Sequence, residues 1–131
     1  MKNYTKEILN EISNVLKSTN QEEVKNLIDT IINANTIITC GAGKVGMAIR
    51  GFCMRLGHFG FKAYHIGDAT LPSIGIGDLL IVASGSGETQ TIYDLTSIAK
   101  KNGAKVFAIT SNTNSRIGLL SDETLMLNAP S

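Results

Sequence analysis

The spacing of apolar residues changes near residue 36 of the chain. Before this point, apolar residues recur three or four positions apart, which predicts an amphipathic helix over residues 3–18 and a second helix with an apolar stripe from Val24 to Ile32. Asn20 lies between them and has a side chain suited to cap the second helix. After residue 36, short apolar runs rich in β-branched residues alternate with helical segments, which predicts a sheet wound by helices.

Five strands and three further helices are expected in this second part. The strands are predicted at residues 36–40, 62–66, 78–84, 104–110 and 123–127, and the helices at 44–59, 89–102 and 115–120. Strands joined through helices by short connections form right-handed crossovers in a parallel sheet. The fold class is therefore α/β, a three-layer, doubly wound, Rossmann-like sheet of five parallel strands preceded by two helices. We divide the chain into a helical segment, residues 1–34, and a sheet domain, residues 35–131.

Composition and charge narrow the classes of function. Of the 131 residues, 43% are hydrophobic and 18% charged, and the formal net charge is +1. This balance provides no basic surface for nucleic acid, and no window of about 18 apolar residues predicts a membrane span. The N-terminus lacks the apolar core of a signal peptide, so we expect a cytoplasmic protein that binds neither nucleic acid nor membrane. Cys40 and Cys53 lack zinc-site spacing, and we expect them in the core and no metal site.

Three predicted strand ends are rich in glycine, hydroxyl and amide residues. The first loop, residues 41–46, reads Gly-Ala-Gly-Lys-Val-Gly; the second, residues 84–89, reads Ser-Gly-Ser-Gly-Glu-Thr; the third, residues 110–114, reads Thr-Ser-Asn-Thr-Asn. The carboxyl ends of parallel strands share one edge, where doubly wound sheets bind their ligands. In the second loop, glycines let backbone N–H groups approach an anion at a helix N-terminus, so this loop predicts phosphate binding.

Each of these loops also has a purely structural interpretation. Gly46 is expected to serve close packing between helix and strand, whereas packing and ligand contact both stay open for Gly41 and Gly43. Ser86 or Thr89 alternatively caps the helix that follows, although capping explains one hydroxyl of the second loop and not all of them.

The first loop also matches the Gly-x-Gly-x-x-Gly pattern of dinucleotide-binding domains. In that interpretation Asp68, near the end of the second strand, binds the ribose. However, Lys44 then enters a loop that a pyrophosphate must approach closely, and the serine-rich second loop is left without a role. We retain dinucleotide binding as a third alternative behind the two functions developed below.

Taken together, these motifs resemble the sugar isomerase (SIS) domain family. The second loop is similar to the family's signature loop, and the combination with the first loop, residues 54–61, residues 70–81 and residues 109–112 resembles its 6-phospho-3-hexuloisomerase branch. Arabinose-5-phosphate isomerases carry a His-Gly-Asp-Leu-Gly motif where this chain has Ile-Gly-Ile-Gly-Asp at residues 74–78, so they fit less well. The resemblance extends from about residue 36 to 128.

The resemblance implies a substrate, a reaction and a set of binding residues. The substrate is a phosphorylated sugar, 3-hexulose 6-phosphate, which is converted to fructose 6-phosphate through a cis-enediolate without a cofactor. The enzyme is a homodimer or homotetramer whose two leading helices pack against other subunits. By the same resemblance, the second loop holds the phosphate, the third loop lines the pocket and the first loop faces the sugar, through Ser84, Gly85, Ser86, Gly87, Thr89, Ser111, Asn112, Gly41, Gly43 and Lys44.

Two departures from the family pattern raise a rival function. Lys44 and Val45 stand where the family carries arginine and serine. Lysine keeps the positive charge but cannot form the bidentate hydrogen bonds of arginine, and valine lacks the serine hydroxyl that is expected to touch the substrate. Family members also continue for about fifty residues, with a glutamate proposed as base, beyond the point that matches Ser131. We therefore expect either a fragment of the enzyme or a non-catalytic, regulatory module that binds a sugar phosphate.

Isomerisation needs a base to remove the proton next to the carbonyl. Glu88, at the mouth of the second loop, is one candidate for this base, although a carboxylate pointing inward there repels phosphate, which favours a position facing solvent or a neighbouring subunit. His58 ends the first crossover helix and is expected to act across a subunit interface, although the helix dipole alone also explains a histidine there. His65 on the second strand is a further candidate.

Overall fold

The computed structural model describes residues 5–15, 20–66 and 73–127, except for a few side chains of the first helix. Every predicted helix and strand is present, with bounds that agree to within one residue in the described ranges. Residues 3, 4 and 16–18 of the first predicted helix, and Asp68, lie outside the described residues. The elements are α1 (Thr5–Val15), α2 (Gln21–Asn33), β1 (Ile37–Gly41), α3 (Gly43–His58), β2 (Ala63–His65), β3 (Leu79–Ala83), α4 (Gln90–Lys101), β4 (Lys105–Thr110), α5 (Arg116–Leu120) and β5 (Glu123–Met126).

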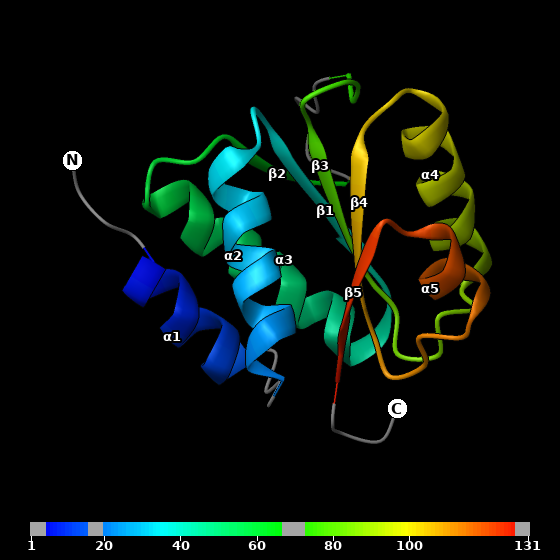
Figure 1. The fold of residues 1–131 in the computed structure, drawn as a ribbon, viewed down its shortest axis with the longest axis horizontal. Coiled ribbons are helices and arrows are strands. Elements are labelled where there is room, and N and C mark those ends of the chain that lie inside the picture. Colours follow the sequence, from blue (N-terminus) through cyan, green and yellow to red (C-terminus); the bar gives the residue numbers. More distant parts are fainter. Residues whose placement is uncertain (1–4, 16–19, 67–72, 128–131) are drawn as a thin grey trace.

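The five strands form one parallel sheet in the order β2-β1-β3-β4-β5 (Figure 1). The chain builds the sheet outward from β1 in one direction through β2, and in the other direction through β3, β4 and β5. The order therefore reverses between β1 and β3, and a crevice forms outside their carboxyl ends at such a switch point. These ends lie toward the bottom of Figure 1, where α3 and α4 begin.

The first face of the sheet is covered by α1, α2 and α3, all on the left in Figure 1. Ile8 and Ile12 of α1 are fully buried. The stripe of α2 packs into the same core from Val24 to Ile31, whereas Ile32, the last residue of the expected stripe, is 48% exposed. The two leading helices were expected to pack against other subunits; their buried stripes instead pack on the sheet of this chain, and subunit contacts through their other faces stay a prediction. Their apolar faces are used within the chain, because β3 and β4 present Leu79, Ile81 and Phe107 to them.

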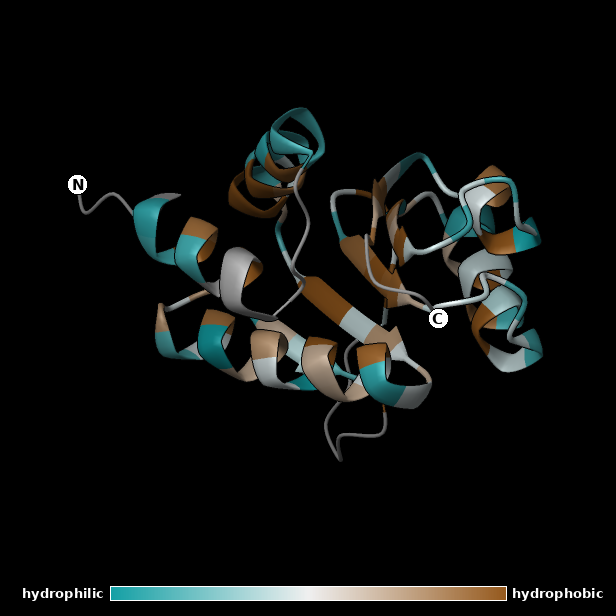
Figure 2. Cartoon of the chain, turned by 90° about the horizontal axis from the view of Figure 1, so that it is seen from below, coloured by the Kyte–Doolittle hydropathy of each residue, from teal (hydrophilic) through white to brown (hydrophobic). Residues whose placement is uncertain are grey.

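The second face is covered by α4 and α5, which pack on Leu80, Val82 and Val106. Because both faces are covered, β3 is buried at every residue, which explains why its sequence is an uninterrupted apolar run. Figure 2 shows these brown strands between the two groups of helices, whose teal residues lie on the outside. Within the described ranges, no helix is long and apolar enough to cross a bilayer.

Candidate functional site

Two helices begin at the switch point without a side-chain cap. Ala42 precedes α3 and has no side chain able to accept a hydrogen bond. Thr89 precedes α4, but its hydroxyl makes no capping bond. By contrast, Asn20 caps α2, as predicted, and Ser115 caps α5. The two helices that face the switch point therefore keep first-turn N–H donors and the partial positive charge of their dipoles available to a ligand.

The hydroxyls of the second loop are organised by bonds within the loop. Ser84 is 1% exposed, and its Oγ lies 2.9 Å from the Thr89 Oγ1 and accepts a bond from the Gly87 N–H at 3.1 Å. Ser86 Oγ accepts a bond from the Glu88 N–H at 3.1 Å. The capping alternative for Thr89 and Ser86 is therefore not what the structure shows. Instead, the hydroxyls hold the loop in shape before any ligand arrives.

Gly87 is required by both backbone and space. Its φ of +72° lies in the left-handed region that side chains disfavour. A Cβ built on this residue would lie 1.8 Å from the Ser115 Oγ, so the second loop packs directly against the start of α5.

In the first loop, packing explains two of the three glycines. A Cβ on Gly41 would lie 2.7 Å from the Gly46 Cα, which confirms the packing role of Gly46 and gives Gly41 one as well. Gly43 has a φ of +66° and open space around it, so only its backbone requires glycine. Lys44 is exposed in the first turn of α3, whereas Val45 is half-buried against the first core. Because its side chain packs there, Val45 is explained by packing where the family carries a serine.

The third loop lies against the second. The Ser111 N–H donates to the Gly85 carbonyl at 3.0 Å, and the Thr110 hydroxyl contacts the same oxygen at 3.2 Å. Asn112 accepts a bond from the Asn114 N–H at 3.1 Å, so its side-chain oxygen shapes a turn. The structure therefore brings all three loops to one edge of the sheet, and ligand contact by their residues stays a prediction.

The candidate acids and bases are distributed less favourably. The Glu88 carboxylate accepts bonds from the Arg116 backbone N–H and guanidinium, both at 2.8 Å, and these bonds hold the pKa of the Glu88 carboxyl below its ordinary value. His58 ends α3, roughly 22 Å along the helix axis from its first residue. It lies at the opposite edge of the sheet. His65 lies at the carboxyl end of β2, with its Nδ1 2.8 Å from the Thr39 Oγ1.

Sequence reasoning did not assign a role to Arg116. It occupies the first turn of α5, where the helix dipole disfavours a cation. An arginine at this position in the sequence is a sign that a carboxylate lies nearby to offset the unfavourable dipole. In the structure that carboxylate is Glu88.

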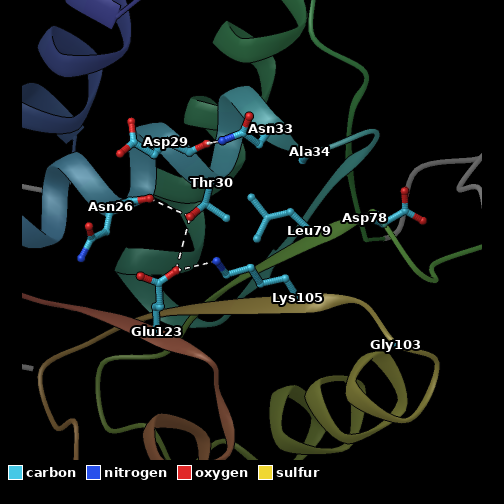
Figure 3. A pocket seen from close by; sticks show the side chains of 11 residues that line it. Asn26, Asp29, Thr30, Asn33, Ala34, Asp78, Leu79, Gly103, Lys105 and Glu123 are labelled. Carbon is cyan, nitrogen blue, oxygen red and sulfur yellow. Dashed lines mark hydrogen bonds and ion pairs between the residues drawn. The ribbon is translucent and has the colours of Figure 1, made fainter.

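A hollow of about 370 Å³ lies at the other edge of the sheet, between α2 and the amino ends of β3, β4 and β5 (Figure 3). The Glu123 Oε2 forms an ion pair with the Lys105 Nζ at 2.9 Å. The same oxygen accepts a long hydrogen bond from the Thr30 hydroxyl at 3.4 Å. These groups satisfy one another, and the first turns of α3 and α4 lie at the opposite edge. We therefore place the candidate site at the switch point and not in this hollow.

No cluster of three or more potential metal ligands occurs among the residues that the structure describes. Cys40 and Cys53 are both buried, as expected, and burial raises the pKa of the Cys40 thiol to about 12. The Cys40 thiol is therefore protonated at neutral pH and is a poor nucleophile.

Comparison with known proteins identifies the family of this site. Residues 30–131 match the model of the SIS domain. The chain is 40% identical over 119 residues to the 3-hexulose-6-phosphate isomerase of Bacillus subtilis, covering 91% of this chain and 64% of the relative. It is 36% identical over 122 residues to the enzyme of the same name from Mycobacterium gastri, covering 93% and 61%. The chain thus spans less than two thirds of the length of these two curated relatives.

A solved structure agrees with this result. A protein from Methanococcus jannaschii, for which a 3-hexulose-6-phosphate isomerase function has been inferred, superposes with a TM-score of 0.80 at 31% identity, covering 97% of this chain and 72% of that one. The doubly wound sheet, the serine-rich second loop and the family match over residues 30–131 lead to one conclusion. The chain belongs to the SIS domain family.

Proposed function

We propose that this chain binds a hexulose 6-phosphate at the switch point and interconverts 3-hexulose 6-phosphate and fructose 6-phosphate. The observation that carries the proposal is the pair of uncapped helices, α3 and α4, that begin beside the serine-rich second loop. A phosphate dianion accepts hydrogen bonds from the free N–H groups in the first turns of both helices and is stabilised by both helix dipoles. The relatives named 3-hexulose-6-phosphate isomerase, at 40% and 36% identity, support the choice of sugar.

The reaction moves a carbonyl by one carbon and needs no external oxidant or reductant. A base removes the proton at C2 of the 3-hexulose, next to the C3 carbonyl, which gives a cis-enediolate. Transfer of the hydroxyl proton from O2 to O3 and return of a proton to C3 leave the carbonyl at C2, which is fructose 6-phosphate. The phosphate at C6 does not react, so its binding in the second loop orients C2 and C3 for proton transfer.

We propose that a histidine transfers the proton, because the Glu88 carboxylate is held by Arg116. His65 lies at the same edge of the sheet as the second loop. His58 lies at the far edge and reaches a phosphate site only if that site belongs to a second copy of the chain. A role for His58 therefore requires the homodimer or homotetramer that the family resemblance implies, which sedimentation of the purified chain measures directly.

Hydrogen exchange in deuterated water tests the proposal. Fructose 6-phosphate is incubated with the chain, and the proton NMR signals at C1 and C3 are followed. We expect deuterium at C3, together with a new ketose signal, and no exchange at C1. H65Q and H58Q are compared with K105A, whose ion pair lies at the far edge. Exchange at C1 would instead indicate an aldose–ketose isomerase and would contradict the proposed reaction.

A second candidate function is binding of the sugar phosphate without catalysis. The observation that favours it is the engagement of Glu88 by Arg116, which leaves the second loop with hydroxyls and N–H donors but no free carboxylate. Saturable binding of fructose 6-phosphate without exchange at C3 is the result that this candidate requires.

A further inference from the structure

Three carbonyl groups of the second loop are turned toward one neighbouring segment, residues 110–117. Three donors of that segment hold three carbonyl oxygens of the loop: Ser111 N–H to Gly85 at 3.0 Å, Ile117 N–H to Gly87 at 3.0 Å, and the Arg116 guanidinium to Glu88 at 3.1 Å. The partial negative charges of these three carbonyl oxygens therefore lie on the side of the loop that faces residues 110–117.

This orientation also sets the direction of the N–H donors. In a trans peptide the carbonyl and the N–H of the next residue point in opposite directions. The N–H groups of Ser86 and Thr89 therefore point away from residues 110–117, and neither has a partner among the described residues. They add to the first-turn donors of α4 on the side where a phosphate would bind. The direction of the Thr89 N–H depends on what holds the Glu88 carbonyl.

Arg116 holds that carbonyl as part of a larger set of contacts. Its Nε donates to the Glu88 Oε1 at 2.8 Å, and its Nη2 donates to both the Glu88 carbonyl at 3.1 Å and the Gln90 Oε1 at 3.2 Å. The guanidinium also lies over the Tyr93 ring, 4.5 Å from the centroid. One side chain thus fixes the end of the second loop and the first turn of α4 to each other.

The charge of Arg116 is neutralised where it lies, because the Glu88 carboxylate pairs with it directly. The pair has no net charge, so it adds little to the attraction of an anion at long range. Arg116 therefore acts on a ligand through the geometry of the loop and not as a free cation.

We infer that Arg116 is a positioning residue of the phosphate site: by holding the Glu88 carbonyl and carboxylate, it directs the Thr89 N–H and the first turn of α4 at the bound phosphate. This inference rests on the proposed function, because it requires that the second loop binds phosphate.

Binding of two ligands to matched variants tests the inference. Inorganic phosphate and fructose 6-phosphate are titrated by calorimetry into the wild type, R116A, R116K, E88Q and the double variant R116A/E88Q. We expect R116A to weaken both ligands about tenfold, because one donor to a charged group is misdirected. E88Q is expected to weaken binding as well, and the double variant is expected to bind no more weakly than R116A, because the two residues act as a unit. Lysine lacks the planar fork, so R116K is expected to restore less than half of the loss.

K105A removes an ion pair of similar exposure at the far edge and is expected to bind both ligands like the wild type. In the isomerase assay, R116A is expected to raise KM more than it lowers kcat, because the phosphate is held before and during the reaction. Wild-type affinity in R116A would overturn the inference. Tighter binding by E88Q would also overturn it, since a released Arg116 would then bind the phosphate itself. If the wild type binds neither ligand, the proposed function fails, and the inference fails with it.

Discussion

Replacing Gly87 by alanine tests the packing of the second loop against α5. Alanine at a φ of +72° has a strain of about 1–2 kcal/mol, because its Cβ meets the neighbouring carbonyl. The new Cβ also displaces Ser115, whose Oγ lies 1.8 Å from that position. Ser115 accepts the cap bond from the Gly118 N–H at 3.1 Å, and losing such a cap costs about 0.5–2 kcal/mol. Ser115 also donates to the Asn112 carbonyl at 2.6 Å, worth about 0.5–1.5 kcal/mol.

These contributions predict that G87A lowers the free energy of unfolding by about 2–5 kcal/mol. Two other glycines provide matched controls. Gly43 has a similar φ of +66° but open space around its Cβ position, so G43A is expected to show only the strain of about 1–2 kcal/mol. Gly51 lies on the exposed side of α3 with open space, so G51A is expected to stabilise the chain by about 0.5–1 kcal/mol.

Urea unfolding at 25 °C, followed by far-UV circular dichroism, measures all three variants, and equal m-values are required for the comparison. In an S115G background the obstacle is removed, so G87A is expected to be less destabilising there than in the wild type. If G87A and G43A are equally destabilised, the packing of Gly87 on Ser115 is refuted as the main cause. An unchanged effect of G87A in the S115G background would refute it independently.

Three further predictions follow from named contacts. S84A is expected to cost about 1–2 kcal/mol of stability and to weaken phosphate binding, because the buried Oγ serves Gly87 and Thr89; S97A on the far part of α4 should leave phosphate binding unchanged. Because the pKa of Glu88 is lowered from 4.5 by its bonds to Arg116, its contribution to stability is present above about pH 4.5 and is lost as the pH falls through the lower, folded-state value. E88Q should therefore show a shallower loss of stability in acid than the wild type, and parallel curves from pH 6 to pH 2 would contradict this. Cys40, with burial raising the pKa of its thiol to about 12, is expected to resist iodoacetamide at pH 8 until urea unfolds the chain, and mass mapping of rapid labelling in the native state would contradict that expectation.

The local structure of this chain followed from short-range patterns. Helical spacing, β-branched runs and capping residues such as Asn20 act over a few residues, and the structure confirms the elements that they predict. The positions of the three loops at one edge followed in turn from the rule for parallel strands. The packing role of Gly46 was anticipated because packing is the general reason for glycine at a helix–strand junction, whereas its contact with Gly41 was not predicted.

Contacts between distant residues could not be anticipated in the same way. Glu88 and Arg116 are 28 positions apart, and their bond depends on how α5 lies against the second loop. The sequence of the leading helices does not show whether their apolar stripes pack on their own sheet or on another subunit, because either arrangement removes the same apolar side chains from water. The strand order likewise depends on the direction of each crossover, which local propensity does not determine.

The central claim is that a phosphate dianion binds where α3 and α4 begin. Titration of the ¹⁵N-labelled chain with inorganic phosphate and fructose 6-phosphate, followed by amide NMR, tests it most directly. We expect saturable shifts of the N–H signals of Ser86, Thr89 and the first turns of α3 and α4, while those around Lys105 and Glu123 at the far hollow stay in place. Shifts confined to the far hollow, or no saturable shift of the first-turn amides, would contradict the claim.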